Sequence, residues 1–328
     1  MIRFVDVAEA SEYFYRLPTA RRIATLSPAY VAADAMRDPM LEPAFLLYED
    51  ARGFWVHAAH LAAILDTTHL DLQSAYGYGG PVADCDDLSF RTDAWRACVQ
   101  ACKERGIVVE FVRLHPLASW QAYSGTVVPD RQVVAIDVSS GNWRESYEVR
   151  CRTAIRKAMK AGVEVIEHPL QDVSGRFANY YRDGMQRIGA TSFYLFNDKY
   201  FQAMSRVPGL RLLACVLDGE WLAAGLFLTG GDCIEYHLSA TSERGRQLSA
   251  TNLLIDAAAQ LASDQGLSML YLGGGTDALP DNALLRFKAS FSPLRLTYCY
   301  GYAIHDQANY SKLRASIGYE GSRVLFYR

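Results

Sequence analysis

RLLACVLDGEWLAAGLFLTGGDCIEYHLSA, residues 211–240, is the segment that decides the fold class of this chain. Its apolar runs Arg211–Leu217, Trp221–Thr229 and Asp232–Ala240 are separated by the dipeptides Asp218-Gly219 and Gly230-Gly231. Asp-Gly and Gly-Gly between apolar runs are typical of tight β-hairpin turns. The segment therefore predicts three consecutive antiparallel strands.

Helices and strands alternate on both sides of this segment. The patterns around it predict the strand Val163–Glu167, the helices Asp172–Ile188 and Asn197–Arg206, the helix Thr251–Gln265, the strand Ser268–Leu272, the helix Asp281–Ser290, the strand Leu294–Ile304 and a last helix near Asp306–Ile317. The first 140 residues give a looser copy of this order. The length of 328 residues predicts two domains, and the repeated order of elements places these α/β (α+β) domains at residues 1–141 and 142–328. The last helix, about residues 305–318, could pack back on the first domain.

The composition excludes several classes of protein. Apolar residues make up 50% of the chain and the net charge is -3, so we expect a folded protein without a strongly basic surface for nucleic acid. The longest apolar stretch, Arg211–Leu228, is broken by Asp218 and Glu220, and the first residues lack the pattern of a signal peptide. The seven cysteines are scattered without a CxxC pair, which predicts reduced thiols, no metal site and a cytoplasmic location.

Four motifs, in a fixed order, carry a resemblance to a known family. They are Tyr76-Gly-Tyr-Gly-Gly-Pro-Val-Ala-Asp84, the basic segment Arg152–Val165 in the helix predicted over Trp143–Ala161, Met185-Gln-Arg-Ile-Gly189 with Lys199-Tyr-Phe201, and Leu285-Arg-Phe-Lys-Ala-Ser-Phe291. The order of elements resembles the GNAT acyltransferase fold, repeated in tandem, and this resemblance implies two GNAT-like domains, each with a twisted mixed sheet flanked by helices. The four motifs and this order of elements together resemble the FemABX family of peptidoglycan aminoacyltransferases and their acyl-CoA-dependent relatives.

The loop after residue 240 is the candidate donor-binding segment. Its residues Arg244, Gly245, Arg246 and Ser249 precede a helix, whose N-terminal N–H groups suit a phosphate or pyrophosphate. In single-domain GNAT enzymes this position holds the coenzyme A pyrophosphate, although the loop here keeps only one glycine of that motif. The alternative is an ordinary surface loop with a capping serine or threonine.

Three residues are candidates for catalysis. Glu235 and His237 alternate along one strand and share a face, so His237 could take the proton of an attacking amine. The alternative is a hydrogen-bonded core histidine. The resemblance implies that Lys288 lies in the catalytic cavity, where it would stabilise an oxyanion or a donor phosphate. The alternative is a solvated helix lysine.

The acceptor is assigned to residues from both domains. Tyr76 and Tyr78 could form a flat wall for a sugar, and Asp84 could accept hydrogen bonds from hydroxyl groups. The resemblance implies that Arg187 binds the acceptor. We expect these residues to line a cleft between the domains. Because Leu26–Ala35 lacks the lysine with which the family holds the acceptor's diphosphate, a nucleotide-linked muramyl peptide is not the expected acceptor.

These features predict an acyltransferase that moves an acyl group from acyl-CoA to an amine of a sugar, peptide or cell-envelope precursor. One alternative is an aminoacyl-tRNA donor, the only case in which nucleic acid would be a partner; the stripe Arg152, Arg156 and Lys160 could then contact the RNA. Another is an inactive GNAT-like scaffold that binds a ligand. A hydrolase is not supported, because the chain has no GxSxG motif.

Overall fold

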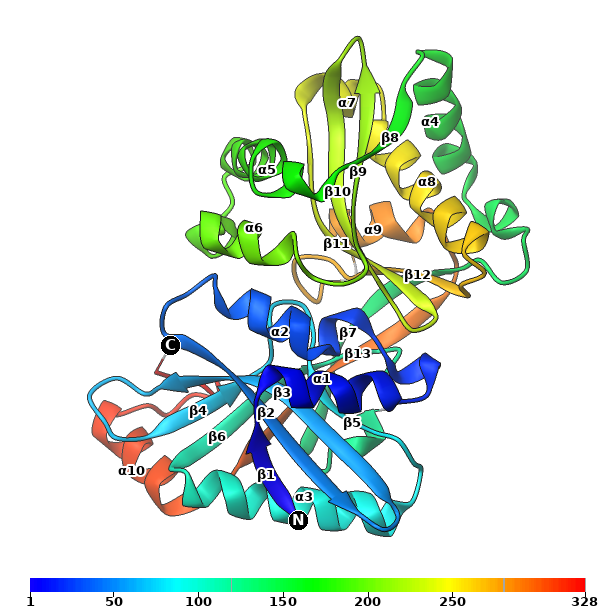
Figure 1. Cartoon of the computed structure of the whole chain (residues 1–328). Helices are drawn as coiled ribbons and strands as arrows, with labels where there is room; N and C mark the ends of the chain where they lie inside the picture. The colour runs from blue at the N-terminus through cyan, green and yellow to red at the C-terminus, as the bar shows by residue number, and fades with distance from the viewer. Residues whose placement is uncertain (119, 280, 328) are drawn as a thin grey trace. The chain divides into compact units, whose positions relative to one another are not determined.

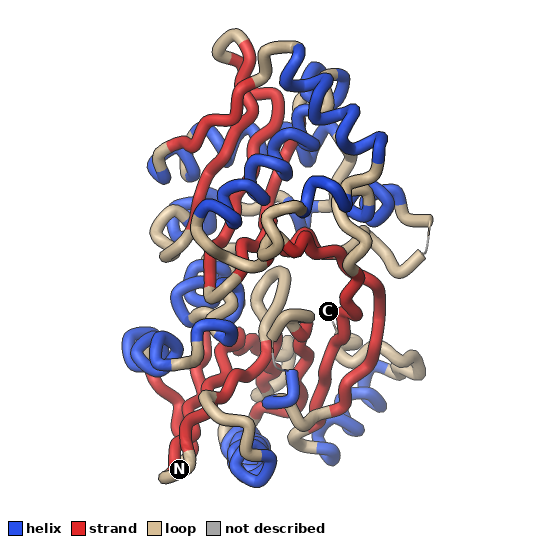
Figure 2. Tube along the Cα trace, turned by 90° about the vertical axis from the view of Figure 1, so that its right-hand side faces the viewer, coloured by secondary structure: helices blue, strands red, loops and turns tan. Residues whose placement is uncertain are grey.

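The computed structural model describes residues 1–118, 120–279 and 281–327. The chain divides into two units: unit 1 comprises Met1–Asp130 and Tyr298–Arg328, and unit 2 comprises Arg131–Thr297. Each unit contains a mixed β-sheet with helices packed against it (Figures 1 and 2). This confirms the predicted α/β fold class.

Unit 1 is built on the strand order β1-β2-β3-β4-β6-β13, and β5 also pairs with β3. The pairing of β4 with β6 is parallel, and the other registered pairs are antiparallel. Its elements are β1 (Ile2–Val5), α1 (Val7–Arg16), α2 (Pro28–Ala35), β2 (Leu41–Asp50), β3 (Gly53–Ala63), β4 (Leu70–Gln73), β5 (Gly80–Ala83), α3 (Leu88–Glu104), β6 (Ile107–Leu114), β13 (Arg295–Ile304) and α10 (Gln307–Ile317).

Unit 2 repeats this plan with the order β7-β12-β11-β10-β9-β8. Only the β11–β12 pairing is parallel among its registered pairs. In Figure 1, α5 and α6 lie on one side of this sheet, and α4 and α8 lie on the other. Its elements are β7 (Thr126–Asp137), α4 (Val149–Lys160), β8 (Glu164–His168), α5 (Arg176–Arg187), α6 (Asp198–Met204), β9 (Leu210–Leu217), β10 (Glu220–Gly230), β11 (Cys233–Thr241), α7 (Glu243–Gln247), α8 (Ala250–Asp264), β12 (Met269–Gly273) and α9 (Ala283–Ala289).

The boundary between the units lies inside two strands, β7 and β13. In unit 2, Val134–Asp137 of β7 pairs with β12, and in unit 1, Cys299–Ile304 of β13 pairs with β6. The sheet of unit 1 is thus completed by a strand from the distant C-terminal part of the chain, and the sheet of unit 2 by a strand from its own N-terminal end. The sequence-based boundary after residue 141, with strand 294–304 in the second domain, differs from this division. Strand periodicity shows which face of a strand is buried, but it does not show which edge strand the strand will join.

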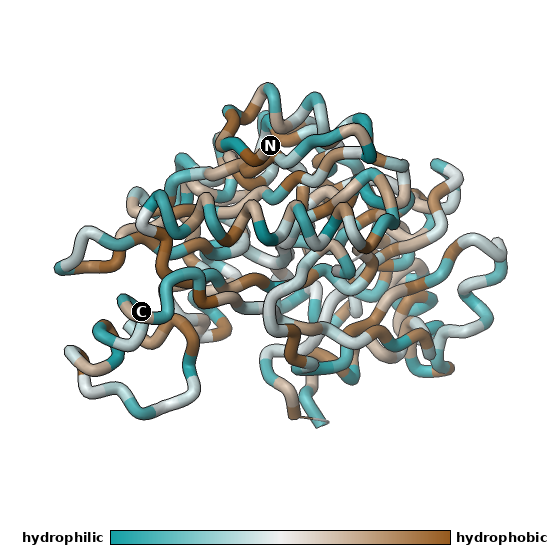
Figure 3. The backbone as a smooth tube through the Cα atoms, turned by 90° about the horizontal axis from the view of Figure 1, so that it is seen from below, coloured by the Kyte–Doolittle hydropathy of each residue, from teal (hydrophilic) through white to brown (hydrophobic). Residues whose placement is uncertain are grey.

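The hairpins β9–β10 and β10–β11 confirm the prediction from residues 211–240. Asp218 and Gly219 have φ values of 52° and 79°, the left-handed conformation that a tight hairpin turn requires. Most residues of the three strands are buried, and α8 packs against them with Leu254, Ile255 and Ala258. Along the helices, apolar and polar residues alternate, as Figure 3 shows, and this is the pattern of helices with one buried face.

Three local predictions are wrong. The donor segment predicted as a loop after residue 240 contains the short helix α7. The helix predicted from Trp143 begins at Val149, because Trp143 and Tyr147 are buried and Tyr147 donates a hydrogen bond to Asp256. The short strands β4 and β5, which lie on either side of Tyr76 and Tyr78, were missed. Each spans only four residues, too few for a clear alternation of buried and exposed positions.

Candidate active site in unit 2

The candidate site lies where β11 separates from β12. The two strands pair in parallel only through Cys233–Glu235 of β11, opposite Met269–Tyr271 of β12. Beyond this point β11 continues along β10 to Thr241, and the register between them skips His237. Such a β-bulge bends a strand and changes the direction of its side chains, often next to an active site.

A pocket of about 370 Å³ opens beside this end of β11. One wall is the end of α5, which packs closely on the strand because Gly184 leaves no side chain against Ala240. The other walls are the ends of the strand and of the following helices. They include Ser239 and Thr241 of β11, Arg246 of α7, Thr251 and Asn252 of α8, and Phe287 of α9.

The N-terminus of α8 forms the polar side of this pocket. Its first-turn residues Thr251 and Asn252 line the pocket, and the Thr251 hydroxyl lies 2.6 Å from that of Thr241. Ser249 precedes the helix with φ 59°, and its side chain makes no capping hydrogen bond. A non-glycine residue in the left-handed conformation costs conformational free energy, and here no capping hydrogen bond compensates for that cost. The free N–H groups at the start of the helix favour binding of an anion.

The structure separates the four predicted donor residues. Gly245, Arg246 and Ser249 line the pocket. Arg244 does not, and its guanidinium pairs with Glu220 at 2.8 Å and with Asp218 at 3.1 Å. Gly245 also has a packing role, because a Cβ there would overlap the carbonyl of Leu222.

Lys288 of α9 is buried, with 8% of its surface exposed. Its Nζ donates a hydrogen bond to the carbonyl of Gly274, 2.8 Å away, and lies 5.9 Å from the ring centre of Tyr236 on β11. Burial lowers the pKa of Lys288 to about 8. A solvated helix lysine is therefore excluded. Of the two flanking aromatic residues, Phe291 is in the core and Phe287 lines the pocket.

Glu235 and His237 lie at the point where the strands separate. Glu235 is buried and forms the last parallel pair, with Tyr271. His237 is the residue skipped by the register, and its Nε2 lies 2.9 Å from the hydroxyl of the buried Tyr200. The bulge breaks the regular alternation on which their shared face was predicted. A hydrogen-bonded histidine is thus present, and its role as a base stays a prediction.

Arg187, the predicted acceptor residue of unit 2, lies at the end of α5. Its guanidinium donates a hydrogen bond to the carbonyl of Thr241, 2.9 Å away. Tyr180 of the same helix accepts one from the N–H of Ser242 at 3.0 Å. Arg187 therefore supports the strand end that lines the pocket.

The predicted acceptor residues Tyr76 and Tyr78 belong to unit 1. The backbone of Tyr76 is held from both sides, because its carbonyl accepts from the Tyr30 hydroxyl at 2.7 Å and its N–H donates to Asp34 at 2.8 Å. Tyr78 packs edge-on against His115, with ring centres 4.7 Å apart. The segment is a fixed loop rather than a free one, and its contact with an acceptor stays a prediction.

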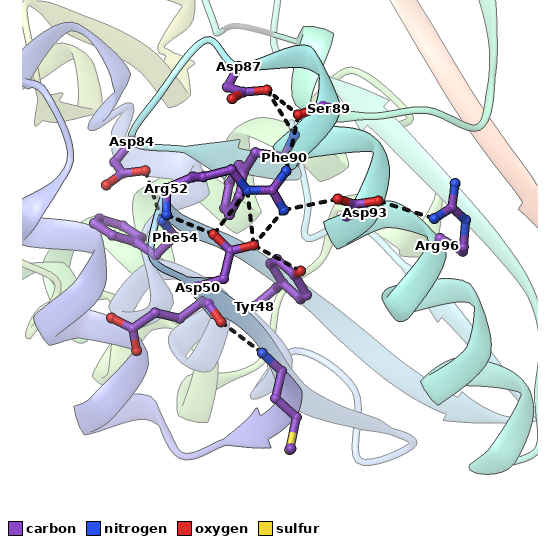
Figure 4. A network of polar contacts seen from close by, with 12 residues as sticks. Tyr48, Asp50, Arg52, Phe54, Asp84, Asp87, Ser89, Phe90, Asp93 and Arg96 are labelled. Atoms are coloured by element: carbon purple, nitrogen blue, oxygen red, sulfur yellow. Dashed lines mark hydrogen bonds and ion pairs between the residues drawn. The ribbon is translucent and has the colours of Figure 1, made fainter.

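Asp84 has a structural partner at the β2–β3 turn (Figure 4). Its carboxylate accepts a hydrogen bond from the N–H of Phe54 at 2.8 Å. The neighbouring Arg52 joins Asp50 and Asp93, and so links the turn to α3. Asp84 therefore holds the hairpin, whatever further contacts it makes.

Comparisons with known proteins agree with this geometry. Residues 146–288 match the family model described as an acetyltransferase (GNAT) domain. The crystal structure of FemX superposes with a TM-score of 0.71 at 13% identity, covering 95% of this chain and 99% of FemX. The chain has the FemABX/GNAT-like acyltransferase fold.

Two further solved structures have this fold. L-PGS from Bacillus licheniformis is similar with a TM-score of 0.60 at 12% identity, covering 95% of this chain and 96% of L-PGS. A tandem GNAT protein from the clavulanic acid biosynthesis pathway gives 0.50 at 10% identity, covering 93% and 99%. A search of curated proteins finds no significant match.

Several residues that line or support the candidate site were missed in the sequence. Ser239, Thr251 and Asn252 carry small polar side chains that are common on any surface, and only the fold brings them to one pocket. Tyr30 and Asp34 are buried on α2, far in sequence from the Tyr76 loop that they hold. Within residues 1–118, 120–279 and 281–327, no three His, Cys, Asp or Glu residues are grouped to hold a metal ion, and no helix is long and apolar enough to cross a bilayer.

Proposed function

We propose that this protein transfers an acyl group from a coenzyme A thioester to an amine of a sugar, peptide or cell-envelope precursor. The observation that carries the proposal is the pocket at the separation of β11 from β12, above the uncapped N-terminus of α8. An uncapped helix N-terminus attracts a pyrophosphate through its free N–H groups and its dipole. Arg246, whose guanidinium pairs with Glu243 on the same short helix, also lines this pocket.

The reaction proposed is a direct transfer. The lone pair of the amine nitrogen attacks the carbonyl carbon of the thioester. The π electrons of the C=O bond move to the oxygen, which gives a tetrahedral oxyanion. The oxyanion then collapses, the C–S bond breaks, and the thiolate of coenzyme A leaves while the nitrogen loses a proton. A fixed cation near the carbonyl stabilises the oxyanion and the thiolate more than the neutral thioester.

Lys288 is the proposed cation. With a pKa of about 8, its ammonium group is mostly charged at neutral pH. Burial strengthens its field, and the hydrogen bond to Gly274 fixes its position. His237 is the proposed acceptor of the amine proton, with Tyr200 orienting its ring.

A second candidate donor is aminoacyl-tRNA. The observation that favours it is the higher TM-score with FemX, 0.71, than with the tandem GNAT protein, 0.50. The attack and the leaving step would be the same, with a ribose hydroxyl in place of the thiol. Incubation with acyl-CoA and with aminoacyl-tRNA, each with a panel of amines, distinguishes the two donors and an inactive scaffold, which would turn over neither.

The donor site itself is tested by calorimetry with acetyl-CoA. Arg246→Ala removes a charge-assisted contact of roughly 1.5–3 kcal/mol and should weaken binding by about tenfold or more. Arg244→Ala is the matched control, because its guanidinium is paired with Glu220 and Asp218 outside the pocket. Equal affinities of wild type and Arg246→Ala would contradict the assignment of this pocket to the donor phosphates.

A further inference from the structure

A second pocket, of about 560 Å³, adjoins the first. The two pockets share Asn252 of α8 and Phe287 of α9, and the second extends toward α4. Arg150 of α4 and Arg286 of α9 line it. The proposed function does not use these two residues.

The two arginines differ in their partners. Arg150 pairs through Nε with Glu148 at 2.6 Å, and its Nη2 donates to the carbonyl of Arg286 at 3.1 Å. Arg150 therefore joins α4 to α9 at the edge of the pocket. Arg286 is exposed, and in the part of the chain that the structure describes no carboxylate forms an ion pair with its guanidinium. Two guanidinium groups with a single carboxylate leave a net positive charge at this pocket.

We propose that this second pocket binds the 3′-phosphate of coenzyme A. The inference rests on the proposed function, because it requires that coenzyme A occupies the first pocket. Coenzyme A carries a pyrophosphate between its pantetheine arm and its adenosine, and a separate phosphate monoester on the ribose of that adenosine. With the pyrophosphate at the start of α8, the adenosine lies along Phe287, and its ribose phosphate reaches the two arginines.

The chemistry of the pocket suits a phosphate monoester. Such a group carries a charge of about -1.5 to -2 at pH 7 and has three acceptor oxygens. A guanidinium presents a planar fork of donors that matches two of these oxygens. The amide of Asn252, shared by both pockets, offers one more donor between the two phosphate positions.

The test compares coenzyme A with 3′-dephospho-coenzyme A, which lacks only this phosphate. Binding of each to the full chain is measured by calorimetry for wild type, Arg286→Ala, Arg150→Ala and Arg156→Ala. Wild type should bind coenzyme A about tenfold or more tightly than the dephospho form, as expected for a lost charge-assisted contact. Arg286→Ala should reduce this preference to near unity while its affinity for the dephospho form stays within about twofold of wild type.

The remaining variants complete the test. Arg150→Ala should lose part of the preference, because Arg150 also holds α9. Arg156 is an exposed arginine of the same helix α4 outside the pocket lining, so Arg156→Ala should keep the full preference. An unchanged affinity for the dephospho form shows in each case that the variant is folded.

The outcomes separate this inference from the proposed function. If wild type binds both compounds equally, the second pocket does not bind the phosphate, while coenzyme A remains the donor. A preference that survives in both Arg286→Ala and Arg150→Ala also overturns the inference. If neither compound binds to wild type, the proposed coenzyme A donor fails together with the inference.

Discussion

The two units use the same position of their sheets in different ways. In unit 2 the strand β11 is interrupted only at His237 and then leaves β12. In unit 1 the corresponding strand is split into β4 and β5, which pair with two successive parts of β3. The segment between them, residues 74–79, carries Tyr76 and Tyr78. In unit 2 a pocket lies beside the interrupted strand, and in unit 1 residues 74–79 lie between the two parts of the split strand.

The contacts of residues 74–79 show that unit 1 holds this segment rigidly. Tyr30 and Asp34 hold the backbone of Tyr76, as described above. The Ser74 hydroxyl accepts a hydrogen bond from the N–H of Arg113 at 3.1 Å, and the N–H of Gly79 donates to the Arg113 carbonyl at 2.8 Å. Because both sides of the loop are bonded to the sheet, we expect little motion there.

The two units also differ in the partners of a buried ionisable side chain, Glu110 in unit 1 and Lys288 in unit 2. In unit 1, Glu110 is fully buried between His57 at 2.9 Å and His305 at 3.2 Å, so each carboxylate oxygen faces an imidazole. In unit 2, the hydrogen bond of the buried Lys288 goes to a neutral carbonyl. Breaking a buried ionic pair is costly for stability. A buried cation such as Lys288, which forms no ion pair with a carboxylate in the described part of the chain, is available for a developing negative charge. The comparison teaches that the buried Glu110 of unit 1 has two charged or polar side-chain partners, whereas the buried Lys288 of unit 2, where we propose the donor site, has a backbone carbonyl.

The largest effect is expected for Glu110→Gln. The variant removes the charge that His57 and His305 share, and loss of one partner from a buried ionic group costs about 3–5 kcal/mol. Urea unfolding followed by tryptophan fluorescence should show this loss in the free energy of unfolding. A loss below about 1 kcal/mol would mean that water screens the group, and the contrast between the units would not hold.

A smaller effect is expected from pH, because titration of His305 leaves the contact of His57 with Glu110 in place. Burial lowers the pKa of His305, but hydrogen bonds with Cys102 and Glu110 raise it to about 10. A raised pKa gives stability that is complete below the unfolded value of about 6.5 and is lost as pH rises toward 10. The urea midpoint should therefore fall between pH 6 and pH 9.

Two variants serve as controls for this pH effect. Glu110→Gln should show a smaller fall, because one of the two partners that raise the pKa of His305 is gone while Cys102 remains. Lys288 acts in the opposite direction: its lowered pKa makes its contribution to stability rise from pH 8 to about 10.5. Lys288→Met should therefore make the fall steeper, and an equal or shallower fall would contradict the assignment of these groups.

For Lys288→Met we expect a loss of turnover with little loss of stability. Removal of one preorganised donor to an oxyanion typically costs on the order of a hundredfold in turnover, about 3 kcal/mol. Methionine keeps most of the apolar stem, so the thermal midpoint should change little. Steady-state kinetics and a melting curve measure the turnover and the thermal midpoint of the variant. In the wild type, turnover should fall as pH rises through about 8, because Lys288 loses its charge there. Turnover within about threefold of wild type, less than 1 kcal/mol, would show that the buried cation has no part in the reaction.

The sequence predicted the elements whose signals are local. The dipeptide Asp218-Gly219 marked a turn that only residues tolerant of positive φ adopt, and both hairpins were correct. The exchange of β7 and β13 between the sheets was not predicted, because an antiparallel strand fits several edges equally well. The sequence could not show which of Arg244 and Arg246 lines the pocket. The two residues lie two positions apart on the short helix α7, and only the three-dimensional structure shows that Arg244 is the one that pairs with Glu220. The pocket needed three-dimensional information, because its residues come from five separate elements.

The smallest effect is expected for substitutions of Asp84. They distinguish a role of this side chain in holding the hairpin from a role in binding the acceptor. The side chain accepts a hydrogen bond from the N–H of Phe54 (Figure 4). Asp84→Asn keeps an oxygen that can accept this bond, so we expect it to cost less than about 1 kcal/mol of unfolding free energy, whereas Asp84→Ala leaves the N–H without its acceptor and costs roughly 1–3 kcal/mol. Melting curves of the two variants test this difference, and equal losses would show that the hydrogen bond does not hold the hairpin. If Asp84 also binds acceptor hydroxyls through its charge, Asp84→Asn should raise the acceptor KM severalfold although its stability is nearly that of wild type. An unchanged KM would mean that Asp84 only holds the hairpin. The contrast between the units would then include this residue, because the charge of Asp84, like that of Glu110, would have its partners within unit 1.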